Sequence, residues 1–512
     1  MPYGMSAIYA FLKENSVPVI QYDFLMEYLF AADGDIDYHN PERTFSEQDF
    51  FDSLDRQGRH KGLDEFTEKY GSRIDPNAGI YAFSVVAYHQ FWSSLLLGRY
   101  IKRLNPHAIV VFGGPFITIK PSDFFVPYGI ADYWIKGSGE LPLLRLHQIL
   151  QGANDFTIDR VPGIIRVSDQ ELLHAPQSVF PAEEERPPDF DGLSLDSYRY
   201  DHYLTGAETL FLPYRFSKGC PSRCSFCTGR LVDRYDCKSA GKIVSELIDL
   251  ARKYQTNSFQ FADASINGNP RLLSEVCDRL IESFPEIRWY AYARVREFSP
   301  ELLRKAKKAG CFALFWGVES AHQPTVDLLG KRFRTEQLND ILDEASALGI
   351  KNYIHLMFNT PHESDQDLRH FVELVEKYID SDWVTFLPQR FLLESQSLMF
   401  DHPDQYGLAN IKRVEASRFE REQWIYEESG GPDHQGVEQR NERNRKALAD
   451  RLDRITYRNM LNESRIRLLK RFPSRWILAI AKRSETSLFM RWIHRILMSL
   501  VRAAAPELKE QL

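Results

Sequence analysis

Apolar and polar positions alternate along the first 150 residues with two different periods. Runs of consecutive apolar residues, typical of buried strands, recur at residues 17–23, 79–86, 108–114 and 131–137. Residues 91–104 instead carry apolar side chains every three or four positions, which predicts an amphipathic helix. Strands alternating with helices predict an α/β fold with a doubly wound, Rossmann-like parallel sheet. Residues 2–15 also predict a helix, and since such a sheet usually opens with a strand, we expect one element to be missing before residue 1.

The next segment, residues 151–208, has no sustained period. Its last part, "PQSVFPAEEERPPDFDGLSLDSYRY", is rich in proline and acidic residues. Such a composition is typical of a connecting segment rather than of a packed element. The sequence therefore predicts a linker here.

A second alternation begins at residue 209. Strand-like runs lie at residues 209–216, 258–265, 288–295, 311–320, 352–360 and 383–392. Helical patterns separate these runs, for example at residues 240–254 and 335–349. Six β/α units in series predict a partial (β/α)6 TIM-type barrel, with its chemistry at the carboxyl ends of the strands.

Beyond residue 400 the pattern becomes charged and helical, which predicts a helical carboxyl-terminal region over residues 401–512. Its end, residues 475–506, combines tryptophan, phenylalanine and isoleucine with arginine. Such an amphipathic helix would suit peripheral contact with a membrane surface and a lipid substrate. The interpretation we favour is a helix that covers the barrel with its apolar face.

Composition narrows the functional class. The chain has 512 residues, a hydrophobic fraction of 43% and a net charge of −7, which suits a globular protein and argues against a general nucleic-acid binder. No apolar run approaches the roughly 20 residues that cross a bilayer, and the first residues lack the features of a secretory signal. Six cysteines are too few for a disulfide scaffold, so we expect a cytoplasmic protein with metal or redox chemistry.

Three cysteines are crowded into "SKGCPSRCSFCTGR", residues 217–230, directly after the first strand of the barrel. Cys220, Cys224 and Cys227 have the spacing C-x3-C-x2-C. One interpretation is a structural zinc site, for which Cys237 would be the fourth ligand. The other is a four-iron cluster in which each thiolate binds one iron and the fourth iron stays open to an external ligand. The position after a barrel strand favours the cluster.

Other charged residues and cysteines of the barrel have predicted roles of their own. Lys218 and Arg223 would offset the negative charge of a cluster. Cys277 and Cys311 lie in apolar contexts and are expected to be buried small hydrophobes.

The stretch "KGCPSRCSFC" on a six-stranded β/α barrel resembles the radical S-adenosylmethionine superfamily, with Phe226 at the aromatic position of the family signature. The resemblance implies a [4Fe–4S] cluster, a flavodoxin- or ferredoxin-like electron donor, and reductive cleavage of S-adenosylmethionine to a 5′-deoxyadenosyl radical. It further implies contacts to S-adenosylmethionine from Phe226, Asp263, Ser265, Glu319, Ser320 and Glu363. In the element after the fifth strand, Asn359, Thr360 and His362 stand where the family pattern has Gly, Leu and Gly, so we expect a different backbone path there.

The first domain also has a family resemblance. Its loops "VVFGGPF" (110–116) and "IKGSGE" (135–140) lack the G-x-G-x-x-G spacing, which argues against NAD or FAD. They resemble the cobalamin-binding domain fused ahead of many radical S-adenosylmethionine enzymes. This implies cobalamin contacts from Ser84, Gly113, Gly114, Gly137, Gly139 and Glu140. The D-x-H-x-x-G motif fails in "DYHNPE" (37–42), so cobalamin is expected to bind without a protein histidine.

The resemblance covers residues 1–395 and implies four parts. These are a cobalamin-binding domain (1–150), a linker (151–208), a radical S-adenosylmethionine barrel (209–400) and a helical region (401–512). The implied activity is a cobalamin-dependent C-methyltransferase acting on an unactivated carbon of a natural product, lipid or peptide. A non-methylating enzyme of the same group, which cyclises, rearranges a ring or matures a peptide, is the alternative. A zinc-stabilised binding protein is the alternative from another class.

Overall fold

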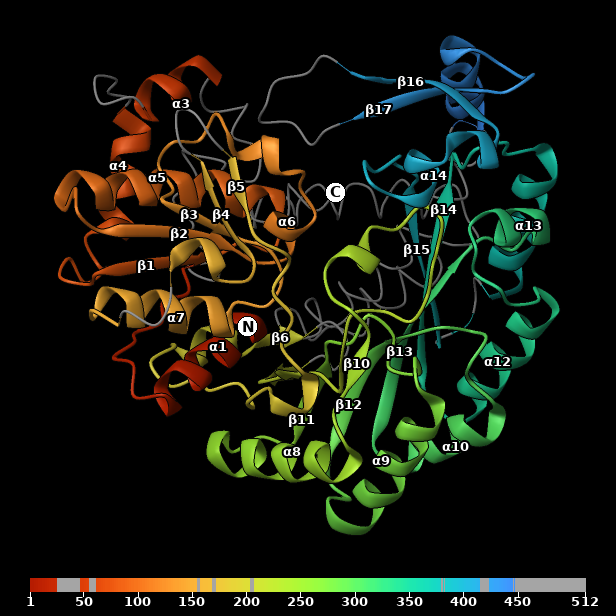
Figure 1. Ribbon diagram of the computed structural model, residues 1–512. Helices are drawn as coiled ribbons and strands as arrows, with labels where there is room; N and C mark the ends of the chain where they lie inside the picture. Colours follow the sequence, from red (N-terminus) through yellow and green to blue (C-terminus); the bar gives the residue numbers. More distant parts are fainter. Residues whose placement is uncertain are drawn as a thin grey trace, which may run out of the picture.

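The computed structural model (Figure 1) describes residues 1–24, 47–54, 61–153, 157–167, 172–202, 207–378, 381, 383–414, 423–444 and 446. The predicted amphipathic helix at residues 475–506 and the "DYHNPE" segment lie outside the described residues. Within the described part of the chain, no helix is long and apolar enough to span a membrane.

The amino-terminal sheet has five strands in the order β1-β2-β3-β4-β5. Its members are β1 (Ile80–Ser84), β2 (Ile109–Gly113), β3 (Tyr133–Ile135), β4 (Ile164–Val167) and β5 (Leu172–His174). The first three are parallel, as predicted, and β4 and β5 are added in antiparallel orientation.

Helices cover both faces of this sheet. On one face, α5 (Tyr88–Leu104) buries Phe91 against Phe112 and Trp134 of the strands. On the other, α7 (Glu140–Leu150) packs Leu146 against β2 and β3. The predicted α/β fold is therefore confirmed, and further helices complete the layers. They are α1 (Tyr3–Glu14), α3 (Glu47–Leu54), α4 (Lys61–Gly71) and α6 (Pro115–Thr118).

Two sequence predictions in this half are wrong. Residues 17–23 form no strand; the segment is extended, and the Gln21 side chain donates to the carbonyl oxygens of Asp189 and Asp191 at 2.8 and 2.7 Å. Its apolar residues pack against neighbouring loops and helices rather than in a sheet. The segment at residues 151–208 is not wholly a linker, since β4 and β5 extend the sheet from within it.

The second half is a six-stranded, all-parallel sheet in the order β15-β14-β13-β12-β11-β8. The strands are β8 (Leu212–Tyr214), β11 (Ser258–Phe261), β12 (Arg288–Ala293), β13 (Cys311–Glu319), β14 (Lys351–Phe358) and β15 (Val384–Arg390). The helices that alternate with them are α8 (Ala240–Tyr254), α9 (Pro270–Ser283), α10 (Pro300–Lys308), α11 (Gln323–Leu328), α12 (Glu336–Ala347) and α13 (Asp365–Tyr378). All six predicted barrel strands are confirmed.

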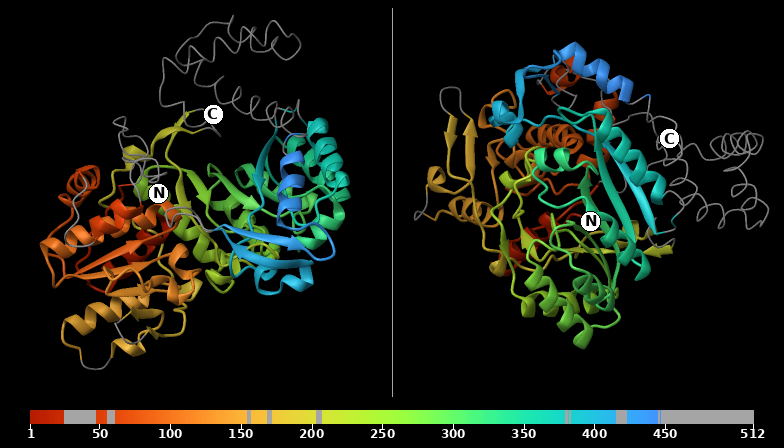
Figure 2. Two further views of the ribbon diagram at one scale, coloured as in Figure 1. Left: turned by 90° about the horizontal axis from the view of Figure 1, so that it is seen from above. Right: turned by 90° about the vertical axis from the view of Figure 1, so that its right-hand side faces the viewer.

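Alternate residues of the barrel strands point to opposite sides, as the pleat requires. Leu314 and Trp316 of β13 and Ile354 of β14 belong to the large core beneath the helices. Phe315 and Tyr353, the intervening residues, belong to a separate cluster on the inner face. Figures 1 and 2 show the strands curving around this inner face with the helices outside.

The region after the barrel departs from the all-helical prediction. It begins with the short helix α14 (Leu398–Asp401) and continues into an antiparallel pair, β16 (Leu408–Arg413) and β17 (Trp424–Glu428). Residues 434–444 are helical, as predicted. Leu408 and Tyr426 pack with residues at the ends of β14 and β15, so the pair is held by burial against the barrel end.

Candidate functional site

The loop with the three cysteines follows β8 and the short strand β9 (Ser217–Lys218), which pairs with β10 (Asp236–Cys237). Gly219 has a φ of +65°, and a Cβ there would lie 2.5 Å from the Asp233 carbonyl oxygen, so only glycine suits the turn into the loop. The loop is anchored by Ser225, whose backbone N–H donates to the Leu329 carbonyl oxygen at 3.0 Å. In turn the Met399 N–H donates to the Ser225 carbonyl oxygen at 2.9 Å.

The three thiols interact electrostatically. Burial, together with the nearby Cys224 and Cys220 thiols, raises the pKa of Cys227, while Lys331 acts in the opposite direction. The Gly229 N–H donates to the Cys227 Sγ at 3.3 Å. The Gly229 N–H donor suits a cysteine sulfur that carries negative charge, as in an iron–sulfur cluster in which each sulfur takes a different iron.

In the described part of the chain, no group of three or more His, Cys, Asp or Glu side chains is placed to hold a metal ion. This applies to the three cysteines as well, so the geometry by itself does not distinguish a single-ion zinc site from a cluster. Cys237 pairs with Ser217 in the β10–β9 ladder, and its thiol is hydrogen-bonded to the Tyr235 hydroxyl group.

Lys331 is a site residue that the sequence analysis missed. It is 6% exposed, and its Nζ lies 3.0 Å from the Glu319 Oε1 and 5.8 Å from the centre of the Phe226 ring. Lys331 thus joins two predicted S-adenosylmethionine contacts next to the cysteine loop. No local motif marks this lysine, since it reaches the site from the turn after α11.

The side chains of Asp263 and Ser265 are buried, and their polar groups form hydrogen bonds within the chain. The carboxylate of Asp263 accepts hydrogen bonds from the backbone N–H groups of Phe216 and Ser217 at 3.0 and 2.8 Å. The Ser265 hydroxyl group donates to the Asn267 Oδ1 at 3.0 Å. In this structure both residues brace the ends of barrel strands.

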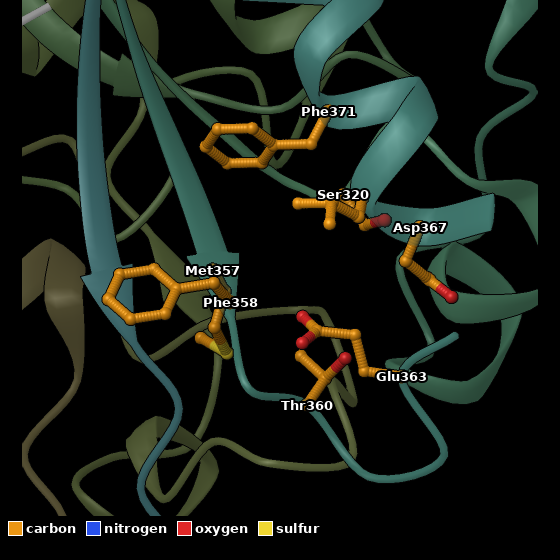
Figure 3. A pocket seen from close by; sticks show the side chains of 8 residues that line it. Ser320, Met357, Phe358, Thr360, Glu363, Asp367 and Phe371 are labelled. Carbon is orange, nitrogen blue, oxygen red and sulfur yellow. The ribbon is translucent and has the colours of Figure 1, made fainter. Parts of the chain in front are cut away.

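Ser320 and Glu363 line one small cavity between the ends of β13 and β14 and the helix α13 (Figure 3). Its lining also includes Thr360, Asp367 and Phe371. Figure 3 shows Thr360 and Glu363 at one end of this cavity and Phe371 at the other. Of the six predicted S-adenosylmethionine contacts, the structure therefore brings Ser320 and Glu363 together here and joins Phe226 and Glu319 through a lysine.

Glu363 also ties the barrel to the carboxyl-terminal region. Its Oε1 accepts from the Asn359 N–H at 2.8 Å and its Oε2 from the Asn444 Nδ2 at 2.7 Å. Burial raises the pKa of this carboxyl group.

The loop after β14 keeps the backbone conformation that glycine favours. Asn359 and His362 have φ values of +61° and +59°, in the left-handed region. The family pattern has glycine at these two positions. Both φ values are ones that glycine adopts readily.

The predicted cobalamin contacts gather at the carboxyl edge of the amino-terminal sheet. Ser84 and Gly113 are register partners at the ends of β1 and β2, and the Val85 N–H donates to the Gly113 carbonyl oxygen at 2.8 Å. Ser84 is exposed, and a Cβ on Gly113 would meet nothing closer than 3.6 Å. This edge can therefore admit a ligand.

Three other glycines of the set are held by contacts within the chain. A Cβ on Gly137 (φ +88°) would lie 2.1 Å from the Ser178 carbonyl oxygen, so this glycine allows the close approach of the connecting segment. A Cβ on Gly114 would meet the Val85 carbonyl oxygen at 2.5 Å, and one on Gly139 would meet Ile8 at 2.8 Å. Packing within the chain accounts for Gly114 and Gly137, whereas Gly139 meets only the flexible end of the Ile8 side chain.

Glu140 is directed toward the barrel. Its Oε1 lies 3.8 Å from the Nζ of Lys218, and both side chains are almost fully buried. Lys218 also lies 3.6 Å from Glu185, which forms an ion pair with Arg215 and lies 3.9 Å from Lys238. Lys218 therefore takes part in a buried charge network between the two halves, rather than extending toward the three thiols as the sequence suggested.

A second contact joins the sheet edge to the barrel. The Gln396 side chain donates to the Ile119 carbonyl oxygen just after α6, and Arg230 of the cysteine loop donates to the Gln396 carbonyl oxygen at 2.8 Å. The carboxyl edge of the sheet and the cysteine loop therefore lie on facing sides of one junction.

Comparison with known proteins agrees with this arrangement. The sequence profile of the Radical SAM superfamily matches residues 214–375, from β8 into α13. A Pyrococcus horikoshii protein, "Uncharacterized methyltransferase PH0819", is 24% identical over 61% of this chain and 67% of its own length. The anaerobic magnesium-protoporphyrin IX monomethyl ester cyclase of Synechocystis is 23% identical over 64% of this chain and 63% of its own length.

The fold itself resembles a solved structure. TsrM, a radical S-adenosylmethionine methyltransferase from Kitasatospora setae, superposes with a TM-score of 0.59 at 18% identity, over 81% of this chain and 76% of that protein. Another structure of TsrM contains cobalamin and a [4Fe–4S] cluster. The shared fold includes both the amino-terminal sheet and the barrel.

Proposed function

Residues 214–375 match the profile of the Radical SAM superfamily, and we propose that this chain is a cobalamin-dependent methyltransferase that acts on an unactivated carbon of a small molecule. The observation that carries the proposal is the junction itself. An open sheet edge at Ser84 and Gly113 and a triple-cysteine loop belong to different domains and are linked through Glu140 and Lys218. A reaction that needs two cofactors at one carbon requires such an arrangement.

In this proposal Cys220, Cys224 and Cys227 hold a [4Fe–4S] cluster, and the sheet edge near Ser84 and Gly113 holds cobalamin. When bound, the cluster supplies the electron that cleaves S-adenosylmethionine, and cobalamin supplies the methyl group. The position of the three thiols on one short loop and the N–H donor from Gly229 to Cys227 support the first assignment.

The protein's own residues orient the reactants and exclude water. The buried Lys331 holds Glu319 in place at 3.0 Å and offsets negative charge near Phe226 and the thiols. Ser320 and Glu363 contribute polar groups at the neighbouring strand ends. Charges in such buried surroundings act more strongly than they would in water.

The first experiment tests the cluster. Anaerobic reconstitution with iron and sulfide should give about four iron atoms per chain and broad visible absorbance. Cys220→Ser, Cys224→Ser and Cys227→Ser should each lose most of that iron. Cys237→Ser is the matched control and should retain it. Loss of iron from the Cys237 variant alone would contradict the assignment.

The second experiment separates methyl transfer from other radical reactions. Methyl transfer should release both S-adenosylhomocysteine and 5′-deoxyadenosine, together with a product heavier by one methyl group. A cyclisation, which the likeness to the Synechocystis cyclase makes the specific alternative, should release 5′-deoxyadenosine without S-adenosylhomocysteine.

We further propose a cytoplasmic location and a flavodoxin- or ferredoxin-like electron donor, since the free thiols and the reduced cluster need a reducing compartment.

A further inference from the structure

The inner face of the barrel carries a continuous set of rings, which we name the inner aromatic layer: Tyr290, Tyr292, Phe315, Tyr353 and His355. These residues come from the neighbouring strands β12, β13 and β14. The Phe315 ring centre lies 5.3 Å from that of Tyr292 and 4.6 Å from that of Tyr353. The His355 ring stacks on Tyr292 at 5.7 Å.

The layer does not serve the helical core. Phe315, Tyr290 and Tyr353 form a cluster separate from the residues beneath the helices. At its upper end Tyr292 remains 43% exposed, although it lies on a central strand of the sheet. The inner side of the barrel therefore leaves the Tyr292 ring partly accessible, while the rings of the separate cluster are buried.

His355 contributes one polar atom to this apolar surface. Its Nε2 is buried and has no hydrogen-bond partner in the described part of the chain. Burial lowers the pKa of this imidazole, so the ring is neutral at neutral pH. A buried polar atom without a partner is destabilising, and a ligand that hydrogen-bonds to it would remove this cost.

The layer borders the proposed reaction centre. His355 is the register partner of Gly317. A Cβ at Gly317 would lie 3.1 Å from the Nζ of Lys331 and 3.3 Å from the Oε1 of Glu319. His355 therefore lies beside the Lys331–Glu319 pair, which continues to Phe226 in the cysteine loop.

We propose that the inner aromatic layer binds the substrate, and that the substrate is a planar conjugated ring system with a hydroxyl or similar group that hydrogen-bonds to the His355 Nε2. This inference rests on the proposed function for the position of the reacting carbon. Ring faces attract a planar π system in offset stacking. A saturated lipid would leave the Nε2 without a partner, and a peptide would find no free strand edge on β12–β14, whose strands are paired on both sides.

Binding of probe molecules to the reconstituted protein tests the proposal without turnover. The probes are 1-naphthol, naphthalene and decahydro-1-naphthol, which differ in the hydroxyl group and in planarity. We expect 1-naphthol to bind about five-fold more tightly than either other probe, by titration calorimetry. Equal or tighter binding of decahydro-1-naphthol would overturn the proposal in favour of a saturated substrate.

Variants locate the binding site. His355→Phe keeps a ring but removes the nitrogen, and should weaken 1-naphthol about five-fold while leaving naphthalene unchanged. Tyr292→Leu should weaken both aromatic probes about three-fold or more. The matched control is Trp383→Leu, which removes an exposed ring (41% exposed) outside the layer and should change neither.

Two results contradict the site: unchanged binding in both layer variants, or an equal loss in Trp383→Leu. Circular dichroism and iron content of each variant confirm that it is folded and loaded. A protein that binds the probes as expected but forms no S-adenosylhomocysteine with any methyl acceptor supports this inference and contradicts the proposed methyl transfer. The two proposals therefore fail separately.

Discussion

The ammonium group of Lys218 lies 3.8 Å from the carboxylate of Glu140, and this contact joins the loop that carries the cysteines to the helix that starts at the sheet edge. Lys218 is two residues before Cys220, and Glu140 is the first residue of α7. The Lys218 Nζ also donates to the Ser138 Oγ at 3.1 Å. A buried ion pair is therefore one of the contacts that hold the two proposed cofactor sites together.

Lys218→Met should destabilise the protein by about 3–5 kcal/mol, because it removes the cation beside the buried carboxylate of Glu140, while Glu185 keeps Arg215. Anaerobic guanidinium denaturation measures the change. Arg279→Met is the control, because Arg279 pairs with Glu275 on the exposed face of α9, and should cost under about 1 kcal/mol. Equal effects of the two substitutions would show that the junction pair does not stabilise the fold.

Lys331→Met should weaken S-adenosylmethionine binding about tenfold or more, because Glu319 loses its charged partner and the site loses a cation near Phe226. Equilibrium dialysis on the reconstituted protein measures the Kd. Lys305→Met, which breaks a contact with Asp278 on the outer helices, should leave it unchanged. Retained affinity in the Lys331 variant would contradict a role in the site.

The stability of the protein should depend on the ionisation of Asp263. Burial raises the pKa of Asp263 to about 6, although N–H groups of Phe216 and Ser217 hydrogen-bond to it. The folded chain therefore holds a proton that the unfolded chain, with a pKa near 3.9, releases. This contribution to stability is complete below about pH 4 and is lost as the pH rises to about 6.

Asp263→Asn removes this titration. The free energy of unfolding of the unsubstituted protein, minus that of the variant, should fall by about 2 kcal/mol between pH 4 and 6 and then stay level. Urea denaturation at a series of pH values measures the difference. A difference that does not change with pH would mean that Asp263 ionises normally.

Asn359→Gly should leave stability unchanged or raise it by up to about 1 kcal/mol, because Asn359 has a φ of +61° and its Oδ1 has no hydrogen-bond partner among the described residues. Asn359→Ala should lower stability by about 1–2 kcal/mol, since alanine tolerates the left-handed region less well than asparagine does. Thermal denaturation followed by circular dichroism compares the two. A stabilised alanine variant would contradict the backbone argument.

Local periodicity was sufficient for the barrel. Each of the six strands appears in the sequence as an apolar run, because both faces of a barrel strand are buried, by helices outside and by other side chains inside. The segment at residues 17–23 has a similar apolar run but forms no strand, and its Gln21 side chain instead donates to the carbonyl oxygens of Asp189 and Asp191. A run of apolar residues indicates that a segment is buried. Whether the segment pairs as a strand depends on residues far away in the sequence.

The residues of the candidate site likewise differ in whether the sequence alone could identify them. The spacing of Cys220, Cys224 and Cys227 could be recognised because the three thiols lie on one short loop. Lys331 could not, because it meets Glu319 and Phe226 only after the chain has turned back past α11. The inward direction of His355 likewise follows from the register of β14 with its neighbours.

By itself, the sequence determined the order of strands and helices in the barrel, the triple-cysteine loop and the glycine-containing sheet edge, because these depend on residues close together in the chain. Only the tertiary structure decided that Glu140 meets Lys218 across the junction, that Lys331 reaches Glu319, and that an aromatic layer lines the barrel. The physical reason is that buried charges and stacked rings are stabilised by partners brought from distant segments, and no local pattern specifies which partners will meet.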